Sequence, residues 1–349
     1  MTRVARVVRT TRVRRGVGAC VLALTCVWTS PAGAEGTHLL VIVGIGGDAE
    51  HRGRFHGWAS RLVDAATAQV GLDPADVHYL GERPDDDPDR IDGRSTRESI
   101  EAALAAIAGR AGADDTIVIV LIGHGSAGQE ESRFNLPGRD LSADEFAMLL
   151  SPFTTQRIVF ANLASASGEF VKALSGSRRT IITATKTGRE RNDTVFGEHF
   201  TAAFGADDES DLDKDGRVSV LEAYTYARRQ VAQTYENDGL LLTEHALLDD
   251  NGDGEGSHEP DPNEADGAVA RTIFLAPRPG EATGAMTADA SPELRALYDE
   301  RRALEERIDV LRASKAGLEP ARYASELETL IIDLARAGRA IREIEGTTP

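Results

Sequence analysis

The chain has 349 residues and carries 57 acidic against 39 basic side chains, which gives a formal net charge of −18. So acidic a chain is a poor partner for nucleic acid or for an anionic membrane surface, and we expect neither as a ligand. The charge suits a protein that binds cations. The length fits one large folded core with an appended segment.

The N-terminus has the three parts of a secretory signal peptide. A basic stretch without acids is followed by an apolar run from Gly16 to Trp28 and by the small-residue sequence Ala32-Gly33-Ala34. The apolar run is shorter than the roughly 20 residues of a membrane-spanning helix, so cleavage is favoured over the alternative, an N-terminal anchor. We therefore predict a signal peptide over residues 1–34 and a mature protein exported to the periplasm or the cell exterior.

Both cysteines of the chain, Cys20 and Cys26, lie inside the predicted signal peptide. Cleavage leaves no disulfide, no thiolate metal site and no cysteine nucleophile. Cleavage also removes six arginines and no acid, so the formal charge falls from −18 to −24.

Short apolar strands and helical segments alternate from His38 onward. A strand over His38–Gly44 ends in a glycine-rich turn, and Thr116–Ile122 is β-branched throughout, as in a central parallel strand. Ser142 and Glu145 have the spacing of a capping box that opens a helix to Leu150. The remaining predicted elements are helices over Phe55–Gln69 and Thr96–Ala108, a loop over 82–94, and strands over Val77–Leu80, Arg157–Asn162, Thr180–Thr183 and Val269–Leu275. This alternation predicts an α/β fold with a mostly parallel sheet and helices on both faces.

Two consecutive predicted strands end in side chains that could carry chemistry. One strand is followed by Gly123-His124-Gly125-Ser126, and the next ends in Asn162 and runs into Ala164-Ser165-Ala166-Ser167-Gly168. In an open α/β sheet, sites form at the carboxyl ends of neighbouring parallel strands. If these strands are neighbours, His124 could act as general base, Ser165 as nucleophile and the Gly125 amide as an oxyanion-hole donor.

The pair of motifs resembles the caspase/legumain-type peptidase family, in which a strand ending in His-Gly precedes a strand ending in Ala-Cys-x-Ser-Gly. The similarity spans roughly residues 38–205. It implies a caspase-like α/β sandwich, a Cys/His dyad that hydrolyses peptide bonds, and peptide substrates. His124 and Gly125 match the family's base and its following glycine, and Ser165 stands where the family has its cysteine.

Because Ser165 replaces the family's cysteine, three functional interpretations remain open. A thiol supplies thiolate unaided, whereas a serine hydroxyl needs a well-aligned base, and no acidic residue is evidently placed to orient His124. The domain could be a non-catalytic module that binds a peptide or protein, a serine hydrolase on a caspase fold, or a fold in which both residues are merely structural. By the resemblance, basic residues after the first strand bind the substrate side chain, and Arg52, Arg54 and His56 lie in that region, where an exposed helix start explains them equally well.

The segment from Asp211 to Glu222 matches the twelve-residue EF-hand calcium loop. In this motif oxygen ligands come from positions 1, 3, 5, 7, 9 and 12, and a glycine at position 6 makes the turn, which here is Gly216. The predicted ligands are Asp211, Asp213, Asp215, the carbonyl of Arg217, Ser219 and Glu222. We therefore predict bound Ca²⁺, with a structural role as the default.

A second acidic turn places Asp249, Asn251 and Asp253 at a similar spacing, but Pro260 occupies its twelfth position. This turn is either an incomplete calcium loop or an Asx-rich turn.

The C-terminal region has leucine and isoleucine at heptad spacing on both sides of Gly317 and Pro320. This pattern predicts a helical hairpin or a two-helix coiled coil, through which the chain could dimerise. The predicted organisation is a signal peptide (1–34), a caspase-like core (35–205), an EF-hand segment with the final strand of the core (206–275), a linker (276–291) and the helical hairpin (292–346).

Overall fold

The structure is a computed structural model that describes residues 36–275, with gaps at 129–130, 206–208, 215–216 and 264. It also describes eight positions between 294 and 311, and residues 320–345. The predicted signal peptide (1–34) and linker (276–291) lie outside the described residues. Among the helices of the described part, none is long and apolar enough to span a membrane.

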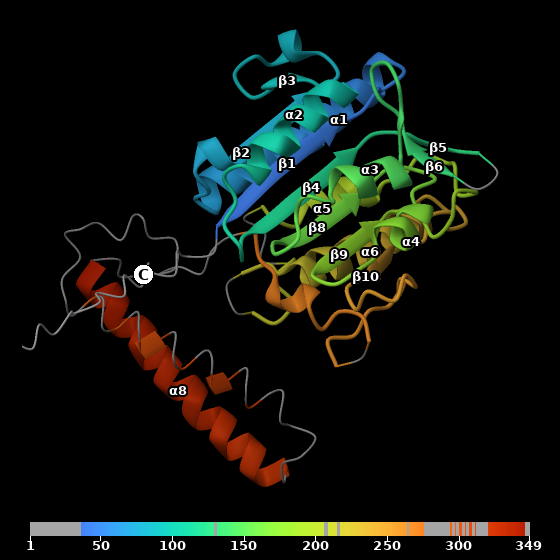
Figure 1. Cartoon of the computed structure of the whole chain (residues 1–349). Helices are drawn as coiled ribbons and strands as arrows, with labels where there is room; N and C mark the ends of the chain where they lie inside the picture. Colours follow the sequence, from blue (N-terminus) through green and yellow to red (C-terminus); the bar gives the residue numbers. More distant parts are fainter. Residues whose placement is uncertain are drawn as a thin grey trace, which may run out of the picture. The chain divides into compact units, whose positions relative to one another are not determined.

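A seven-stranded sheet forms the centre of the core (Figure 1), with the strand order β10-β9-β8-β4-β1-β2-β3. Six of the strands are parallel, and only β10 runs antiparallel to its neighbour β9. The strands are β1 (Thr37–Val43), β2 (Val77–Gly81), β3 (Gly93–Arg94), β4 (Thr116–Ile122), β8 (Arg157–Asn162), β9 (Arg179–Thr183) and β10 (Leu247–Asp249). The predicted α/β class with a mostly parallel sheet is confirmed.

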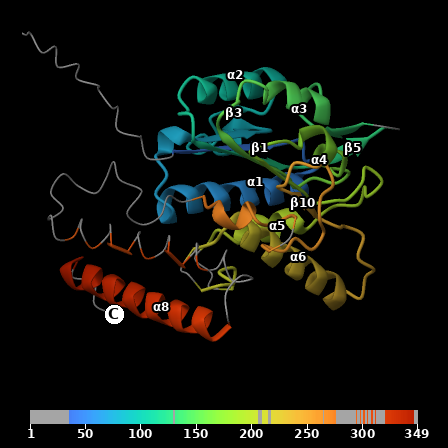
Figure 2. The ribbon, with the colours of Figure 1, turned by 60° about the horizontal axis from the view of Figure 1, so that its bottom comes forward.

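The sheet is buried on both faces by helices (Figure 2), which explains why its central strands are almost wholly apolar. Helices α1 (Ala49–Asp64), α5 (Phe196–Ala202) and α6 (Val220–Asn237) cover one face and share a core with strand residues such as Val41 and Val120. Helices α2 (Arg97–Ala108), α3 (Ala143–Leu149) and α4 (Glu169–Leu174) cover the other face, with Leu40 and Ile119. Successive residues of a strand therefore point to opposite faces of the sheet and pack in different hydrophobic cores.

Helix starts follow the capping residues of the sequence. Thr96 caps α2, and the Ser142 hydroxyl and Glu145 carboxylate form the predicted capping box at α3. Helix α1 begins at Ala49, six residues before the predicted start, because Asp48 accepts the His51 amide at 2.9 Å and caps the helix there. This earlier start places His51 in the first turn of the helix.

Several short elements were not predicted. A small antiparallel sheet contains β5 (Gly125–Ala127), β6 (Ser132–Phe134) and β7 (Leu141–Ser142). Short 3₁₀ turns also occur at Pro74–Asp76, Pro84–Asp86 and Ala270–Thr272. The predicted helix to Gln69 is α1 continued by a π-helical turn (Ala65–Gln69).

The predicted strand over Val269–Leu275 is wrong. A 3₁₀ turn occupies Ala270–Thr272, and only a single bridge links Phe274 to Ser219. The cause is the buried Asp250 carboxylate, which accepts hydrogen bonds from the amides of Gly267, Val269 and Ala270 at 2.7–3.0 Å. These bonds hold the segment in a turn around the carboxylate. The edge of the sheet is instead β10, just before Asp250.

The C-terminal region contains α8 (Pro320–Glu345). Leu304, Ile308 and Leu311 share a buried apolar cluster with Leu330, Ala337 and Ile341 of α8. Apolar positions on both sides of the predicted break therefore pack together, as in a hairpin; residues 312–319 lie outside the described residues.

Candidate functional site

His124 and Ser165 follow adjacent strands, as predicted. Strands β4 and β8 pair in parallel with Leu121 opposite Asn162, so both loops leave the sheet at one edge. Gly125, the residue after His124, forms hydrogen bonds with the Ser165 side chain. The two motifs therefore meet in space.

The Ser165 hydroxyl, however, is engaged by the backbone of Gly125. Its Oγ accepts the Gly125 amide at 3.3 Å and lies 3.4 Å from the Gly125 carbonyl oxygen, to which it can donate. Within the described part of the chain, no hydrogen bond joins this hydroxyl to the His124 ring. The side chain is buried, with 4% of the residue exposed. The amide predicted for the oxyanion hole therefore binds the serine hydroxyl itself.

The glycines of the two motifs allow close approach of backbone segments. A Cβ on Gly125 would lie 2.0 Å from the Ser165 carbonyl oxygen, and one on Gly168 would lie 2.2 Å from the Lys186 carbonyl carbon. No side chain fits at either position. Packing alone thus requires both glycines, whatever the chemistry of the site.

Ala166, immediately after Ser165, adopts a left-handed conformation with φ of 53°. Such a conformation costs a non-glycine residue about 1–2 kcal/mol and needs support from its surroundings. Ala166 is fully buried, and its amide donates to the Glu190 carbonyl oxygen at 2.7 Å. The loop after β8 is therefore held in a fixed and strained shape.

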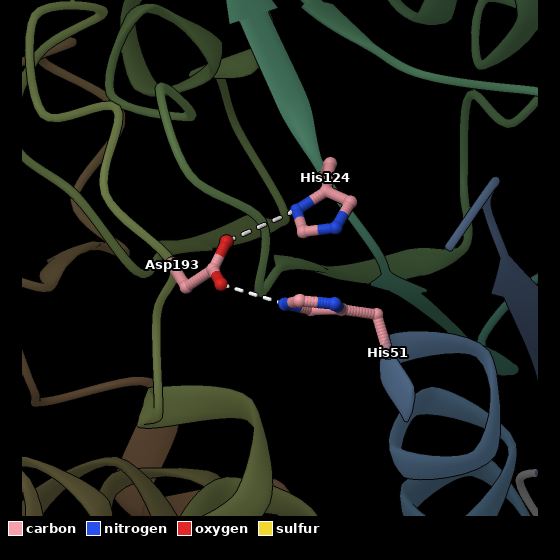
Figure 3. A group of neighbouring side chains, drawn as sticks. All are labelled: His51, His124 and Asp193. Atoms are coloured by element: carbon pink, nitrogen blue, oxygen red, sulfur yellow. Dashed lines mark hydrogen bonds and ion pairs between the residues drawn. The ribbon is translucent and has the colours of Figure 1, made fainter. Parts of the chain in front are cut away.

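An acidic residue does face His124, contrary to the expectation from the sequence. Asp193 lies in the loop after β9, and its Oδ1 is 3.4 Å from His124 Nδ1 (Figure 3). The Phe55 ring packs edge-on against the imidazole, with 5.1 Å between ring centroids. The His51 ring lies on the imidazole as well, with 4.9 Å between ring centroids, so one carboxylate and two rings surround His124.

His51 is a further member of the site that the sequence did not reveal. Its Nε2 lies 2.7 Å from Asp193 Oδ2, and its Nδ1 lies 2.8 Å from Asp48 Oδ2. A ring with a carboxylate at each nitrogen is stabilised as imidazolium. The hydrogen bond to Asp193, and then that to Asp48, raises the pKa of His51 above its usual value. The His51 amide and ring in turn lower the pKa of Asp48.

Three anchors hold the loop that carries Asp193. The Thr194 hydroxyl donates to the Leu163 carbonyl oxygen at 2.8 Å, and the Asn192 amide group donates to Thr243 Oγ1 at 3.1 Å. The buried Glu244 carboxylate accepts the amides of Val195 and Phe196 at 3.0–3.1 Å. Hydrogen bonds thus hold the residues before and after Asp193, while the Asp193 side chain itself is about half exposed.

The contributing strands β1, β4, β8 and β9 are neighbours in the sheet. His51 follows β1, His124 follows β4, Ser165 follows β8 and Asp193 follows β9. The site therefore lies at the carboxyl edge of a parallel sheet, where α/β proteins place their ligands.

The three basic residues considered for specificity are dispersed. Arg54 lies over the Trp58 ring at 5.7 Å from its centroid, with Nη2 at 3.9 Å from Asp193 Oδ2. The Arg52 guanidinium faces Glu82 at 3.7 Å. His56 contacts the Tyr79 hydroxyl at 2.9 Å. Of the three, only Arg54 borders the site.

The predicted calcium loop brings three of its ligands together. Oxygens of Asp211, Asp213 and Glu222 lie within 4.8 Å of one another. Glu222 Oε1 accepts the amides of Leu212 and Asp213, and Ser219 caps α6 in a second capping box with Glu222. The Arg217 guanidinium lies 3.4 Å from the centroid of the Phe274 ring. Asp215 and Gly216 lie outside the described residues.

The second acidic turn is a chain of Asx hydrogen bonds. Asp249 Oδ1 accepts the Gly252 amide at 3.0 Å, and Asn251 Oδ1 accepts the Asp253 amide at 2.8 Å. The Asp249 residue is buried, and its Oδ2 has no hydrogen-bond partner. Asp266 lies close by, and its pKa is raised by burial and by the charges of Asp249, Asp250 and Asp253.

No protein-family model matches the sequence, and no curated protein matches it. Among solved structures, the chain is similar to the initiator caspase Dronc of Drosophila, with 12% identity over 63% of this chain and 81% of that chain, and a TM-score of 0.38. Nothing about the chemistry of the site follows from a likeness at this level.

Proposed function

We propose that the chain is an exported, calcium-binding protein whose caspase/legumain-like domain binds a peptide or protein without cleaving it. The observation that carries this proposal is the engagement of the Ser165 hydroxyl by Gly125. A serine nucleophile needs a base within hydrogen-bond reach, and among the described residues the Ser165 hydroxyl forms its hydrogen bonds with Gly125 and none with the His124 ring. The polar edge formed by His51, His124, Asp193 and Arg54 is the surface available for a ligand.

Peptide hydrolysis tests this proposal. The full chain, with Ca²⁺ present, should not hydrolyse a fluorogenic peptide library, and random peptides captured from a display library should be recovered intact. Capture should fall in the Arg54→Ala variant, which alters the edge of the site, and persist in Arg52→Ala, whose side chain faces Glu82. Hydrolysis by the wild type that is lost in Ser165→Ala would overturn the proposal.

The Asp193–His124 contact favours a second candidate, a hydrolase with Ser165 as nucleophile and His124 as base. A carboxylate on Nδ1 holds the imidazole in the tautomer that accepts a proton at Nε2. In that case Asp193→Asn, His124→Ala and Ser165→Ala should each lower kcat strongly. Ser165→Cys should gain or keep peptidase activity, whereas Ser167→Cys, two residues along the same motif, should not.

Calcium binding at residues 211–222 is part of the proposal. The donor set is all oxygen, as Ca²⁺ prefers, and the loop ends at a capped helix. Calorimetric titration should find a calcium site that is lost in Glu222→Gln and kept in Glu236→Gln, an exposed position of the same helix. Unchanged binding in Glu222→Gln would refute the assignment.

We also propose a second calcium site at Asp249, Asn251 and Asp253. Support comes from the buried Asp249 Oδ2, because an unpartnered carboxylate oxygen in the interior is strongly disfavoured unless a cation neutralises it. Asp253→Ala should remove one calcium equivalent, and the exposed Glu255→Ala should not.

For the C-terminal helices we propose self-association with a second copy of the chain. Helix α8 exposes Ile331, Ile332 and Ile344 by 42–48%, although its other apolar face is already covered. Analytical ultracentrifugation should find a dimer that Ile331→Asp and Ile332→Asp dissociate. A monomer in the wild type would contradict this part of the proposal.

A further inference from the structure

Three side chains from distant parts of the chain converge at the candidate site. His51 comes from the first turn of α1, His124 follows β4, and Asp193 lies in the loop after β9 (Figure 3). One potential ligand atom from each lies within 4.8 Å of the others. The exposed fractions of the side chains, 20%, 24% and 53%, leave this point open to solvent.

The structure assigns to His51, His124 and Asp193 a binding site for a divalent transition-metal ion, for which we propose Zn²⁺. The inference deepens the proposed binding function, because it names an ion through which the site could take its ligand. The inference rests on the proposed non-catalytic function, in which His124 does not act as a general base.

The distance between His124 and Asp193 fits a tetrahedral ion, whereas that between His51 and Asp193 is too short for one. Zinc binds histidine nitrogen and carboxylate oxygen at about 2.0–2.2 Å, so two ligands of one tetrahedral ion lie about 3.3–3.5 Å apart. The separation of His124 Nδ1 and Asp193 Oδ1, 3.4 Å, already has this value. The His51 Nε2–Asp193 Oδ2 distance of 2.7 Å is that of a hydrogen bond. On binding, His51 Nε2 and the Asp193 carboxylate would have to move apart, and the proton between them would leave to solvent.

The surroundings of His51 are those of a metal ligand. In metal sites the second ring nitrogen of a histidine usually donates to a carboxylate, which fixes the ring. Here His51 Nδ1 faces Asp48 Oδ2 at 2.8 Å, and Asp48 is itself fixed as the N-cap of α1. With Nδ1 held in this way, Nε2 is the nitrogen left to bind the ion.

The donor set selects the type of ion. Two imidazoles and one carboxylate suit zinc or a similar first-row ion, whereas Ca²⁺ and Mg²⁺ prefer oxygen donors. The site is therefore chemically distinct from the proposed calcium loops. Three protein ligands leave the fourth position of a tetrahedral ion to water or to a carboxylate of the bound peptide.

Zinc titration of the full chain tests the inference. Cys20→Ser and Cys26→Ser exclude thiolate binding, and excess Ca²⁺ occupies the oxygen sites. Calorimetry should find one zinc equivalent per chain, lost in His51→Ala and in Asp193→Ala. His56→Ala should keep it, because this histidine of the same helix contacts Tyr79 instead.

A milder variant guards against loss of folding. Asn caps helices as well as Asp, so Asp48→Asn should keep the Tm while weakening zinc binding by about tenfold or more. Co²⁺ bound in place of Zn²⁺ should give visible absorption bands of a tetrahedral site. Absence of zinc binding, or equal binding in the wild type, His51→Ala and Asp193→Ala, would overturn the inference. Those outcomes differ from peptide hydrolysis, which would overturn the proposed function instead.

Discussion

The buried carboxyl group of Glu244 should make the stability of the core depend on pH. Only 3% of this residue is exposed, and its carboxylate accepts the amides of Val195 and Phe196 beside the loop that carries Asp193. Burial raises the pKa of Glu244 from 4.5 to about 7, against the opposing effect of these hydrogen bonds. The folded protein therefore holds a proton on Glu244 at pH values where the unfolded chain has lost it.

The sign and size of the effect follow from proton linkage. Because the folded-state pKa is the higher one, the stabilisation is fully present below pH 4.5 and is lost as the pH rises to about 7. At 1.36 kcal/mol per pKa unit, the difference is worth about 3 kcal/mol. Gln carries no charge at any of these pH values, so Glu244→Gln should remove this part of the dependence.

The assay is urea unfolding followed by Trp58 fluorescence between pH 4.5 and 8, with Glu236→Gln as an exposed control. The unfolding free energy of the wild type should fall across this range by about 3 kcal/mol more than that of Glu244→Gln. Parallel curves for the two proteins would refute the reasoning. A wild-type curve that instead rises more steeply would show that the hydrogen bonds from Val195 and Phe196 outweigh burial.

Three further predictions concern packing and charge at the site and helix capping outside it. Gly125→Ala should lower the unfolding free energy by about 3 kcal/mol, because its Cβ would overlap the Ser165 carbonyl oxygen. The control Gly53→Ala, where a Cβ in α1 meets no other atom, should raise the unfolding free energy by about 0.5–1 kcal/mol. Urea unfolding measures both changes. Asp193→Asn should lower the pKa of His51, and NMR titration of the ring should find this shift but none in the remote variant Asp144→Asn. Ser142→Ala should lose about 1 kcal/mol of stability through the capping box of α3, and an unchanged midpoint in urea would contradict the cap's contribution.

The sequence predicted those features that depend on neighbouring residues. Strands β4 and β8 begin and end where their β-branched and apolar runs do, and the capping box at Ser142 marks the start of α3. The meeting of the His124 and Ser165 motifs followed from two consecutive parallel strands, which are neighbours more often than not.

The features that the sequence missed depend on distant contacts. His51 and Asp193 are 142 positions apart, and no periodicity connects them. A local signal existed only for His51, since Asp48 stands at the N-cap spacing three residues before it. The prediction of a strand over Val269–Leu275 was wrong for a similar reason, because the buried Asp250 carboxylate accepts three backbone amides from residues 267–270. In both cases a carboxylate in a loop decided the local structure.

Covalent labelling of Ser165 tests the central claim most directly. The full chain, with Ca²⁺ present, is incubated with a fluorophosphonate probe and its intact mass is measured. Since the Ser165 hydroxyl is bound by Gly125 and has no hydrogen bond to His124, we predict no added mass. One probe per chain that disappears in both Ser165→Ala and His124→Ala would contradict the account and establish an active serine nucleophile.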